Sequence, residues 1–145
     1  MAVLLPFERQ ATLDKMYTAL MLTPEEREFA LWGKVSRQKW HEHFAEADVL
    51  GFRVAGELVG GACFKGMHLH IAVMPAYRSR WFPLCQKVVN YGFRKYGNPL
   101  YARVNIRNAR ALAFVQQVGC VEHSRDEFSV TFLVTPEGMR YRKRG

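Results

Sequence analysis

The sequence predicts an α/β fold in which helices cover both faces of a central mixed, largely antiparallel β-sheet. Hydrophobic residues recur at helical spacing before Asp48, with a period of two after it, and at helical spacing again in two later segments. Elements that interleave in this way pack as a sheet flanked by helices. The 145 residues, 49% of them hydrophobic, suffice for one buried core. We therefore expect a single domain over residues 1–138, followed by a basic C-terminal tail over residues 139–145.

The N-terminal third predicts one short strand and two helices. Val3–Leu5 is the expected strand, and the apolar positions between about Ala11 and Leu22 have helical spacing. Thr23–Glu26 then has the composition of a helix start, because a hydroxyl residue precedes a proline and two acidic residues. This second helix is expected to be interrupted at Gly33 and to resume around Trp40.

Three strands are predicted next, at Val49–Val54, Leu58–Phe64 and His68–Val73. Ala55–Glu57 has the composition of a tight turn, so we expect the first two strands to form a hairpin. Lys65–Gly66 is the expected connection to the third strand. This part of the sheet should therefore be antiparallel.

The C-terminal half predicts a helix, a strand, a second helix and a final antiparallel pair of strands. The expected ranges, in chain order, are Leu84–Tyr96, Leu100–Ile106, Asn108–Gly119, Cys120–Ser124 and Phe128–Val134. The second helix begins at an asparagine, which can cap its first turn, and ends at a glycine, which permits a left-handed exit. Its apolar residues fall on one face.

The whole chain has a net charge of +8. Its positive charge is concentrated in the middle of the sequence. No acidic residue occurs between Glu57 and Glu122, and this stretch contains basic residues at Lys65, Arg78, Arg80, Lys87, Arg94, Lys95, Arg103, Arg107 and Arg110. We expect a positive surface there for a polyanion, either a phosphorylated cofactor or a nucleic acid, or else a merely solvated basic face. The sequence has no recognition motif for nucleic acid. A second basic cluster, Arg140–Arg144, closes the chain.

Cysteine usage and hydropathy exclude several classes of protein. Cys63, Cys85 and Cys120 are widely spaced and form no Cys-x-x-Cys motif, so we expect buried free thiols and no metal site. His41 and His43 point to different faces of a helix, which also argues against a metal. The sequence has neither an apolar run long enough for a membrane span nor a basic leader, so a cytoplasmic protein is expected, in a host cytoplasm or a virion if phage-encoded.

Two motifs resemble those of the GNAT superfamily of N-acetyltransferases. The first is Val73-x-Pro75-x-Tyr77-Arg78, which begins at the end of the predicted strand His68–Val73. The second is the Asn108–Gly119 helix, with Ala111 and Phe114 at the family's positions. The resemblance implies a GNAT fold, acetyl-CoA as the acyl donor and transfer of the acyl group to an amine.

The chain departs from both motifs where the family does its chemistry. The family's Arg/Gln-x-x-Gly-x-Gly/Ala turn, which binds the cofactor's diphosphate, is replaced by Arg78-Ser79-Arg80-Trp81-Phe82-Pro83, without either small residue. The family's proton-donating tyrosine is replaced by Val115, and Tyr91, Tyr96 and Tyr101 are alternatives that the sequence does not place. Basic side chains would then bind the phosphates in place of backbone amides, or Trp81 and Phe82 would fill the groove.

The resemblance and the charge pattern together give a set of candidate site residues. The expected cofactor-binding residues are Val73, Met74, Arg78, Ser79, Arg80, Trp81, Lys87 and Asn108. A backbone amide at Val73 or Met74 would stabilise the oxyanion. The expected bases are His68 and His70, which lie two residues apart on one strand face and titrate near neutral pH.

Two functions remain open at this stage. The first is an acyl-CoA-dependent N-acetyltransferase. The second is a catalytically inactive GNAT-like structural or interaction protein with protein partners in an assembly, because the chain also resembles small GNAT-like proteins of tailed phages, including virion-associated components. That second resemblance rests on Asn108–Gly119 without the tyrosine and on the basic, glycine-poor loop.

Overall fold

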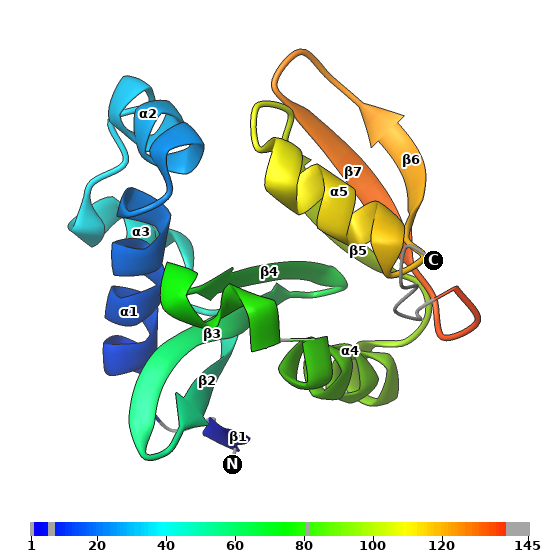
Figure 1. Ribbon diagram of the computed structural model, residues 1–145, viewed down its shortest axis with the longest axis horizontal. Coiled ribbons are helices and arrows are strands. Elements are labelled where there is room, and N and C mark those ends of the chain that lie inside the picture. The colour runs from blue at the N-terminus through cyan, green and yellow to red at the C-terminus, as the bar shows by residue number, and fades with distance from the viewer. Residues whose placement is uncertain (1, 6–7, 81, 139–145) are drawn as a thin grey trace.

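Seven strands form one sheet with the order β1-β2-β3-β4-β5-β7-β6 in the computed structural model, which describes residues 2–5, 8–80 and 82–138 (Figure 1). The strands are β1 (Ala2–Leu5), β2 (Asp48–Val54), β3 (Glu57–Lys65), β4 (His68–Val73), β5 (Leu100–Asn105), β6 (Val121–Arg125) and β7 (Ser129–Val134). All neighbouring strands are antiparallel except β4 and β5, which are parallel. The predicted mixed, largely antiparallel sheet is confirmed.

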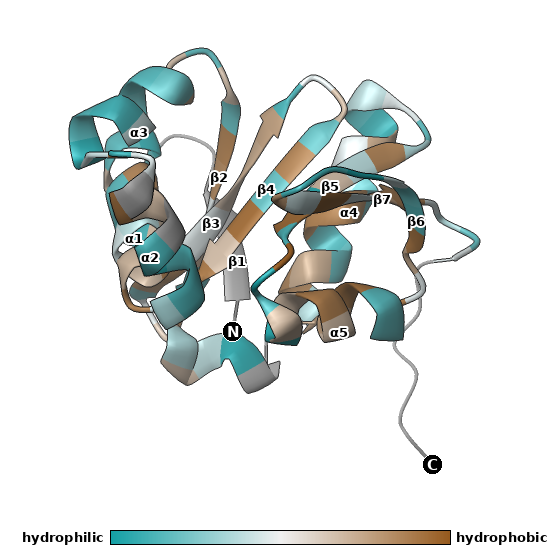
Figure 2. Cartoon of the chain, turned by 90° about the horizontal axis from the view of Figure 1, so that it is seen from above, coloured by the Kyte–Doolittle hydropathy of each residue, from teal (hydrophilic) through white to brown (hydrophobic). Residues whose placement is uncertain are grey.

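Helices cover both faces of this sheet (Figures 1 and 2). They are α1 (Arg9–Met21), α2 (Pro24–Trp32), α3 (Arg37–His43), α4 (Phe82–Tyr96) and α5 (Ala109–Gln117). One buried cluster joins α1 and α3 to the sheet, as in the packing of Met16 and Phe44 on Cys63. A second cluster joins α4 to the opposite face, where Val88 and Val89 pack with Phe52 and Phe64.

The region between α1 and β2 contains two helices, not one helix with an interruption. Lys34 has a φ of 55°, a left-handed conformation that ends α2. The Ser36 side chain then accepts a hydrogen bond from the backbone N–H of Lys39 and caps α3. A further difference lies after β4, where Pro75–Arg80 forms a short 3₁₀-helix that the sequence pattern does not predict.

The predicted hairpin between β2 and β3 is confirmed. Val54 pairs with Glu57, so the connection is the two-residue turn Ala55-Gly56. Both turn residues have positive φ, 51° and 82°, as a type I′ turn requires. The turn sets the register of the first two residue pairs, and the register then shifts between Phe52 and Arg53.

Helix α5 begins as the sequence predicts. Asn108 is its N-cap, and Oδ1 of this residue accepts a hydrogen bond of 3.1 Å from the Ala111 N–H. Gly119, with a φ of 96°, supplies the left-handed exit just beyond the C-terminal end. The Asn108 side chain also donates a hydrogen bond of 2.9 Å from Nδ2 to Glu26 Oε1 on α2.

We expect Asn108→Ala to lower the free energy of unfolding by about 1 kcal/mol, since the substitution removes the cap. Urea unfolding at neutral pH measures the effect. Asn108→Ser is the matched control, because serine retains a capping oxygen and should recover most of the lost stability. An unchanged urea midpoint for Asn108→Ala would contradict the capping role.

The feature that positions the functional site is the short pairing between β4 and β5. These strands pair only at His68 with Tyr101 and at Leu69 with Ala102. Strand β4 continues to Val73 and β5 to Asn105, so the later residues of both strands diverge. The sheet therefore opens between its two central strands.

Candidate functional site

A cleft of about 540 Å³ lies where β4 and β5 diverge. Residues of α1, α2, α4 and α5 line it as well as the two strands. Because side chains alternate along a strand, each strand presents different residues to the two faces of the sheet. The cleft consequently has two chemically different sides.

The side toward α4 and α5 is apolar. Leu69, Ile71 and Val73 of β4 contribute to the core cluster around α4, and Val104 of β5 packs against α5. Other apolar residues line the cleft here, namely Cys85 and Val89 of α4, Ala111, Phe114 and Val115 of α5, and Val118 and Cys120 beyond α5. Figure 2 shows hydrophobic residues along β4 and on α5. This side suits an extended ligand with few charges.

The side toward α1, α2 and α3 is more polar. His70 lies on this face, because its ring packs edge-on against Phe44 with centroids 5.2 Å apart. Arg103 and Asn105 of β5 share the face, since they alternate with the Val104 that packs on α5. Glu26 of α2 also lines this side and is half-buried, among apolar residues of the same helices such as Met16 and Trp40. Within the described residues it is the one carboxylate that lines the cleft.

The backbone amide of Val73 faces the cleft. The Met74 N–H donates a hydrogen bond of 2.8 Å to the Val59 carbonyl of β3, whereas the Met67 carbonyl accepts one from Tyr101 on the β5 side. Hydrogen-bonding directions alternate along a strand, so residues 67, 69, 71 and 73 direct their N–H and C=O groups toward β5. Strand β5 has diverged at the level of Val73. Of the two amides considered from sequence, that of Met74 is bonded within the sheet and that of Val73 is directed into the cleft.

The two candidate histidines occupy different environments on the same face. His68 is exposed, and its ring stacks on Tyr101 with centroids 5.2 Å apart, away from the residues that line the cleft. His70 lines the cleft. Burial first, and then the nearby positive groups of His43, His68, Lys65 and Arg103, lower the pKa of His70 from 6.5 to about 4. The His70 imidazole is therefore neutral at pH 7 and is a weak proton acceptor.

The burial of His70 predicts that the stability of the folded protein depends on pH. The folded pKa of His70 lies below the unfolded value, so the unfolded state binds more protons between pH 6.5 and 4. Stability should fall by up to about 3 kcal/mol as pH decreases through this window and should be fully present above pH 6.5. Burial and then Lys65 also lower the pKa of His43, which adds in the same direction.

Urea unfolding of the parent and of His70→Gln between pH 4 and pH 7 tests this expectation. The variant should lose less stability on acidification than the parent, because glutamine does not titrate. The matched control is His123→Gln, at a position where the side chain is exposed. Equal pH dependence of the parent and His70→Gln would contradict the burial of a neutral imidazole.

The proposed phosphate-binding residues do not all converge on the cleft. Arg78 lines it and is half-buried, with Nη2 donating to Oγ1 of Thr23. Burial, and next the charge of Arg110, lowers the pKa of Arg78. Lys87 is exposed on α4 and is not among the lining residues. The backbone of Ser79 and Arg80 belongs to the 3₁₀-helix, and Trp81 lies outside the described residues.

Glu26 is a site residue that sequence reasoning did not single out. In the sequence it is one of two acidic residues near the positive end of a helix dipole. In the structure its Oε1 accepts a hydrogen bond from Asn108, 82 residues later in the chain. No local pattern contains a contact of this sequence separation. Both ends of the Asn108 amide are thus engaged, since Nδ2 donates to Glu26 and Oδ1 caps α5.

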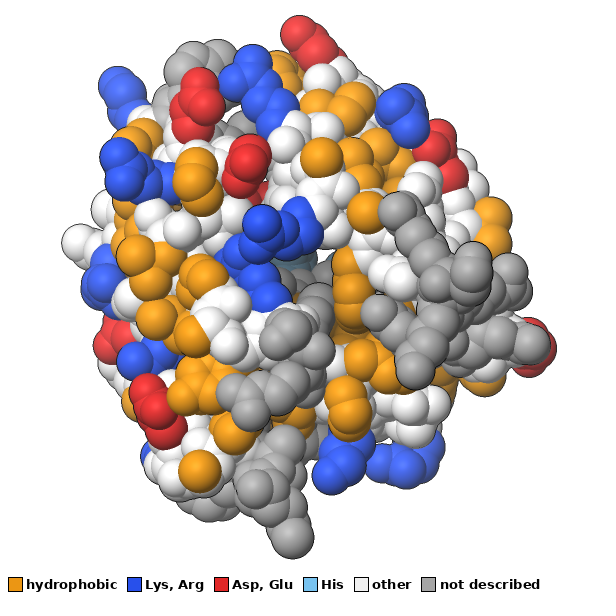
Figure 3. Space-filling view, in the orientation of Figure 1, with side chains coloured by type: hydrophobic (Ala, Val, Ile, Leu, Met, Phe, Trp, Pro, Cys, Tyr) orange, Lys and Arg blue, Asp and Glu red, His pale blue; other side chains and the backbone are white. Residues whose placement is uncertain are grey.

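The expected positive surface is partly neutralised by carboxylates from outside the basic segment. Three such ion pairs are Lys95–Asp48 at 2.8 Å, Arg103–Asp126 at 3.1 Å and Arg107–Glu28 at 3.4 Å. The fold brings these carboxylates to the segment from other elements. Figure 3 shows basic and acidic side chains interspersed on the displayed face. Three of the nine basic residues of the segment are thus paired with carboxylates.

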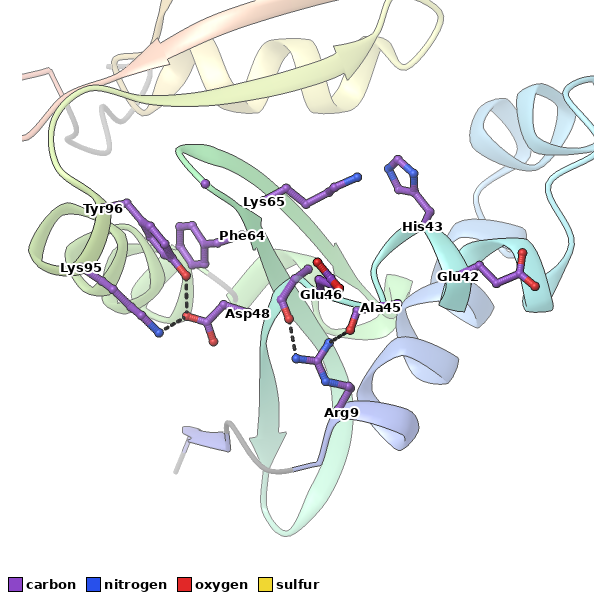
Figure 4. Close-up of a pocket in the computed structure, with 12 residues that line it drawn as sticks. Arg9, Glu42, His43, Ala45, Glu46, Asp48, Phe64, Lys65, Lys95 and Tyr96 are labelled. Carbon is purple, nitrogen blue, oxygen red and sulfur yellow. Dashed lines mark hydrogen bonds and ion pairs between the residues drawn. The ribbon is translucent and has the colours of Figure 1, made fainter.

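A second hollow of about 700 Å³ lies beside the first residue of β2 and the last residues of β3 (Figure 4). Its charged groups bond mainly to neighbouring protein groups. Asp48 Oδ2 accepts hydrogen bonds from Tyr91, Lys95 and Tyr96, and Arg9 donates to backbone carbonyls after α3. This hollow is wide and open to solvent. We therefore place the candidate site in the cleft, although its volume is smaller.

The described residues contain neither a metal-binding cluster nor a membrane-spanning helix. Over the parts of the chain that the structure describes, no three His, Cys, Asp or Glu side chains are grouped to hold a metal ion. None of the helices in those parts is long and apolar enough to cross a membrane. Cys63 and Cys85 are buried free thiols, as expected, whereas Cys120 is half-buried. Burial raises the pKa of Cys63 and of Cys85 to about 12.

Comparison with solved structures identifies the fold. A GCN5-related N-acetyltransferase structure from Rhodopseudomonas palustris matches 93% of this chain and 94% of its own, with a TM-score of 0.67 and 18% identity. The chain has the GNAT fold. The ribosomal-protein-S18-alanine N-acetyltransferase of Escherichia coli matches over 100% and 98% of the two chains, with a TM-score of 0.67 and 14% identity.

A third GNAT structure was determined with a ligand. It is the PaiA N-acetyltransferase of Thermoplasma acidophilum in complex with coenzyme A, which covers 93% of this chain and 99% of its own, with a TM-score of 0.65 and 11% identity. No family profile matches the sequence, and no curated protein matches it at a significant level. The GNAT likeness is therefore one of fold.

Val115, which stands at the tyrosine position in the sequence resemblance, lines the cleft on its apolar side. Of the three alternative tyrosines, Tyr91 and Tyr96 bond to Asp48 beside the second hollow, and Tyr101 stacks on His68. None of the three is among the residues that line the cleft. The cleft therefore has an aliphatic side chain, with no proton to donate, at Val115.

Proposed function

We propose that the protein binds acyl-CoA in the cleft between β4 and β5 and transfers the acyl group to an amine. The single observation that carries this proposal is the opening of the sheet at β4, which leaves the Val73 amide directed into a cleft with one apolar and one polar side. The apolar side fits the pantetheine arm and the acyl group. The polar side fits the amine, so both reactants can meet at Val73.

Individual residues would have separate roles. The Val73 amide would donate a hydrogen bond to the thioester carbonyl oxygen and stabilise the negative charge that develops there. Arg78, at the cleft, would bind phosphate, with Arg80 and Lys87 as further candidates. Glu26 would hold the incoming ammonium group and accept its proton. We prefer Glu26 to His70 as the base, because its carboxylate attracts the ammonium group, whereas His70 lies among positively charged side chains that repel it.

The reaction transfers one acyl group, and an ammonium acceptor loses two protons. Glu26 takes the first proton and releases it to solvent, which leaves a neutral amine. The amine nitrogen then forms a bond to the carbonyl carbon, the bond from that carbon to sulfur breaks, and the electron pair leaves with the sulfur. The second proton lost by the nitrogen passes to Glu26. The sulfur must gain a proton or leave as a thiolate, and Val115 has no proton to donate. The chemistry supplied by acetyl-CoA is that of an activated thioester.

Acetyl-CoA binding tests this proposal most directly. A ligand that binds only the folded state stabilises it by about 2.7 kcal/mol at a concentration of 100 times Kd, so the melting temperature should rise. ATP is the control, because it is a polyanion without the pantetheine arm. Absence of a saturable shift with acetyl-CoA, or an equal shift with ATP, would refute the proposal.

A second function, that of a non-catalytic GNAT-like structural or interaction protein, is favoured by the chemistry of the cleft. Val115 cannot donate a proton, and His70 is a weak base. Such a protein, a virion-associated component being one example, would retain the fold without turnover. Saturable acetyl-CoA binding without release of coenzyme A in the presence of amines supports this alternative, whereas amine-dependent release supports the enzyme.

A further inference from the structure

An unpartnered hydrogen-bond donor lies in the cleft. Nδ2 of Asn105, the last residue of β5, is buried and has no hydrogen-bond partner among the described residues. Asn105 is one of the residues that line the cleft. Leaving a buried donor without an acceptor is unfavourable, and such groups are rare in folded proteins. A ligand that brings an acceptor atom would satisfy it.

The orientation of the Asn105 amide is determined by its other end. Oδ1 accepts a hydrogen bond of 3.0 Å from the backbone N–H of Arg107. If the amide were turned over, two donors would face each other, so the nitrogen must be the free atom. Side-chain alternation along β5 places Asn105 on the face opposite α5, the polar side of the cleft. The free donor of Asn105 therefore lies on the polar side of the cleft, where the amine is proposed to bind.

Asn105 and Glu26 are linked through one residue. The Asn105 carbonyl accepts a hydrogen bond of 2.9 Å from the Asn108 N–H, and the Asn108 side chain donates to Glu26. The neutral donor of Asn105 and the Glu26 carboxylate are thus connected through Asn108 on the polar side. Together they complement a ligand that carries a positive charge and an oxygen acceptor close together.

We propose that the acyl acceptor is an α-amino-acyl amine, such as the N-terminus of a peptide, whose carbonyl oxygen accepts a hydrogen bond from Asn105 while its ammonium group faces Glu26. This inference rests on the proposed acyl transfer and goes beyond it by naming the class of acceptor. Asn108, which the sequence suggested as a ligand-binding residue, already uses its side-chain oxygen and one N–H within the fold. Asn105 is the neighbouring amide with a free donor.

The charge around the cleft disfavours a polyamine. Three guanidinium groups belong to the lining residues, those of Arg78, Arg103 and Arg110. Arg103 is paired with Asp126, which leaves Arg78 and Arg110 opposite a single lining carboxylate. A ligand with several positive charges would meet repulsion there. A ligand with one ammonium group next to a carbonyl oxygen fits the charges of the cleft lining better.

Steady-state kinetics with matched amines test the acceptor class. The probes are trialanine amide, which has an amine beside a carbonyl, propylamine, which has no carbonyl, and spermidine, which has several cationic amines. We expect the parent to have the highest kcat/KM with trialanine amide. In Asn105→Asp, which retains the oxygen that accepts from Arg107 and replaces the donor by an acceptor, KM for trialanine amide should rise about tenfold with kcat unchanged.

Two controls make the result specific. Asn105→Asp should lower KM for spermidine, because a second carboxylate attracts polycations, and a merely structural role would not reverse the preference. Thr12→Val removes the other buried unpartnered polar atom, Oγ1 on α1, which is not at the cleft, and should leave all three KM values unchanged. If Asn105→Asp melts below the assay temperature, Asn105→Ala replaces it, with the same expected rise in KM for trialanine amide.

The outcomes separate this inference from the function on which it rests. Acetyl-CoA binding is measured first by calorimetric titration of the parent and of each variant. No binding to the parent would refute the proposed function and this inference with it. Normal acetyl-CoA binding, combined with a preference for spermidine or with an unchanged KM for trialanine amide in both Asn105 variants, would refute the acceptor assignment alone.

Discussion

Replacing Val73 by proline is expected to lower kcat for acyl transfer by about 10²- to 10³-fold, the cost of removing one donor from an oxyanion hole. Proline has no N–H, so the substitution removes the one group that the proposed reaction needs at this position. The ladder with β3 does not use this N–H, because the Val73 amide faces the cleft. Ala72 is in an extended strand, which is compatible with a following proline.

Two controls separate the amide from the side chain and from the strand. Val73 is buried against α4, and Val73→Ala removes its methyl groups but keeps the N–H, so kcat should remain near that of the parent. Met74→Pro removes the hydrogen bond to Val59 and should destabilise the sheet instead. Thermal melting of each variant accompanies the rate measurement. Equal loss of kcat in Val73→Ala and Val73→Pro would remove the oxyanion role of this amide.

The strands and helices were predictable because their signals are local. Alternating hydrophobic residues located β2, β3 and β4 to within one residue at each end, and the turn residues Ala55 and Gly56 located the hairpin. Asn108 and Gly119 located both ends of α5 for the same reason. Each of these features depends on the chemistry of a few consecutive residues.

The cleft could not be predicted in the same way, since it depends on where two strands separate. The pairing of β4 with β5 stops at Leu69 and Ala102, and no residue at that point signals the divergence. Glu26 contacts Asn108, which is distant in the sequence. The unpartnered Nδ2 atom of Asn105 is likewise a property of the folded chain and has no sequence signal. The sequence does not distinguish Arg78 from Lys87 as phosphate-binding residues. The structure does, because Arg78 lines the cleft and Lys87 faces solvent.

Val115→Tyr is expected to raise kcat, because it places a proton donor at the position of the cleft that now holds an aliphatic side chain. Val115 lies on α5 and lines the apolar side, where the leaving sulfur would be. A tyrosine with a pKa of about 10 remains protonated at neutral pH and can protonate a departing thiolate. General acid catalysis contributes about 10²-fold at the lower end of its usual range, so we expect an increase of that order.

Val115→Phe is the matched control for this variant, since phenylalanine fills the same space without a hydroxyl group. The two variants should have similar melting temperatures and similar affinities for acetyl-CoA. Release of coenzyme A at saturating amine measures kcat for the parent and for both variants. If tyrosine and phenylalanine give the same kcat, proton donation to the sulfur does not limit the reaction. If Val115→Tyr alone accelerates it, the parent is an acyltransferase that operates without this donor, and the fold retains the rest of the catalytic arrangement around Val73.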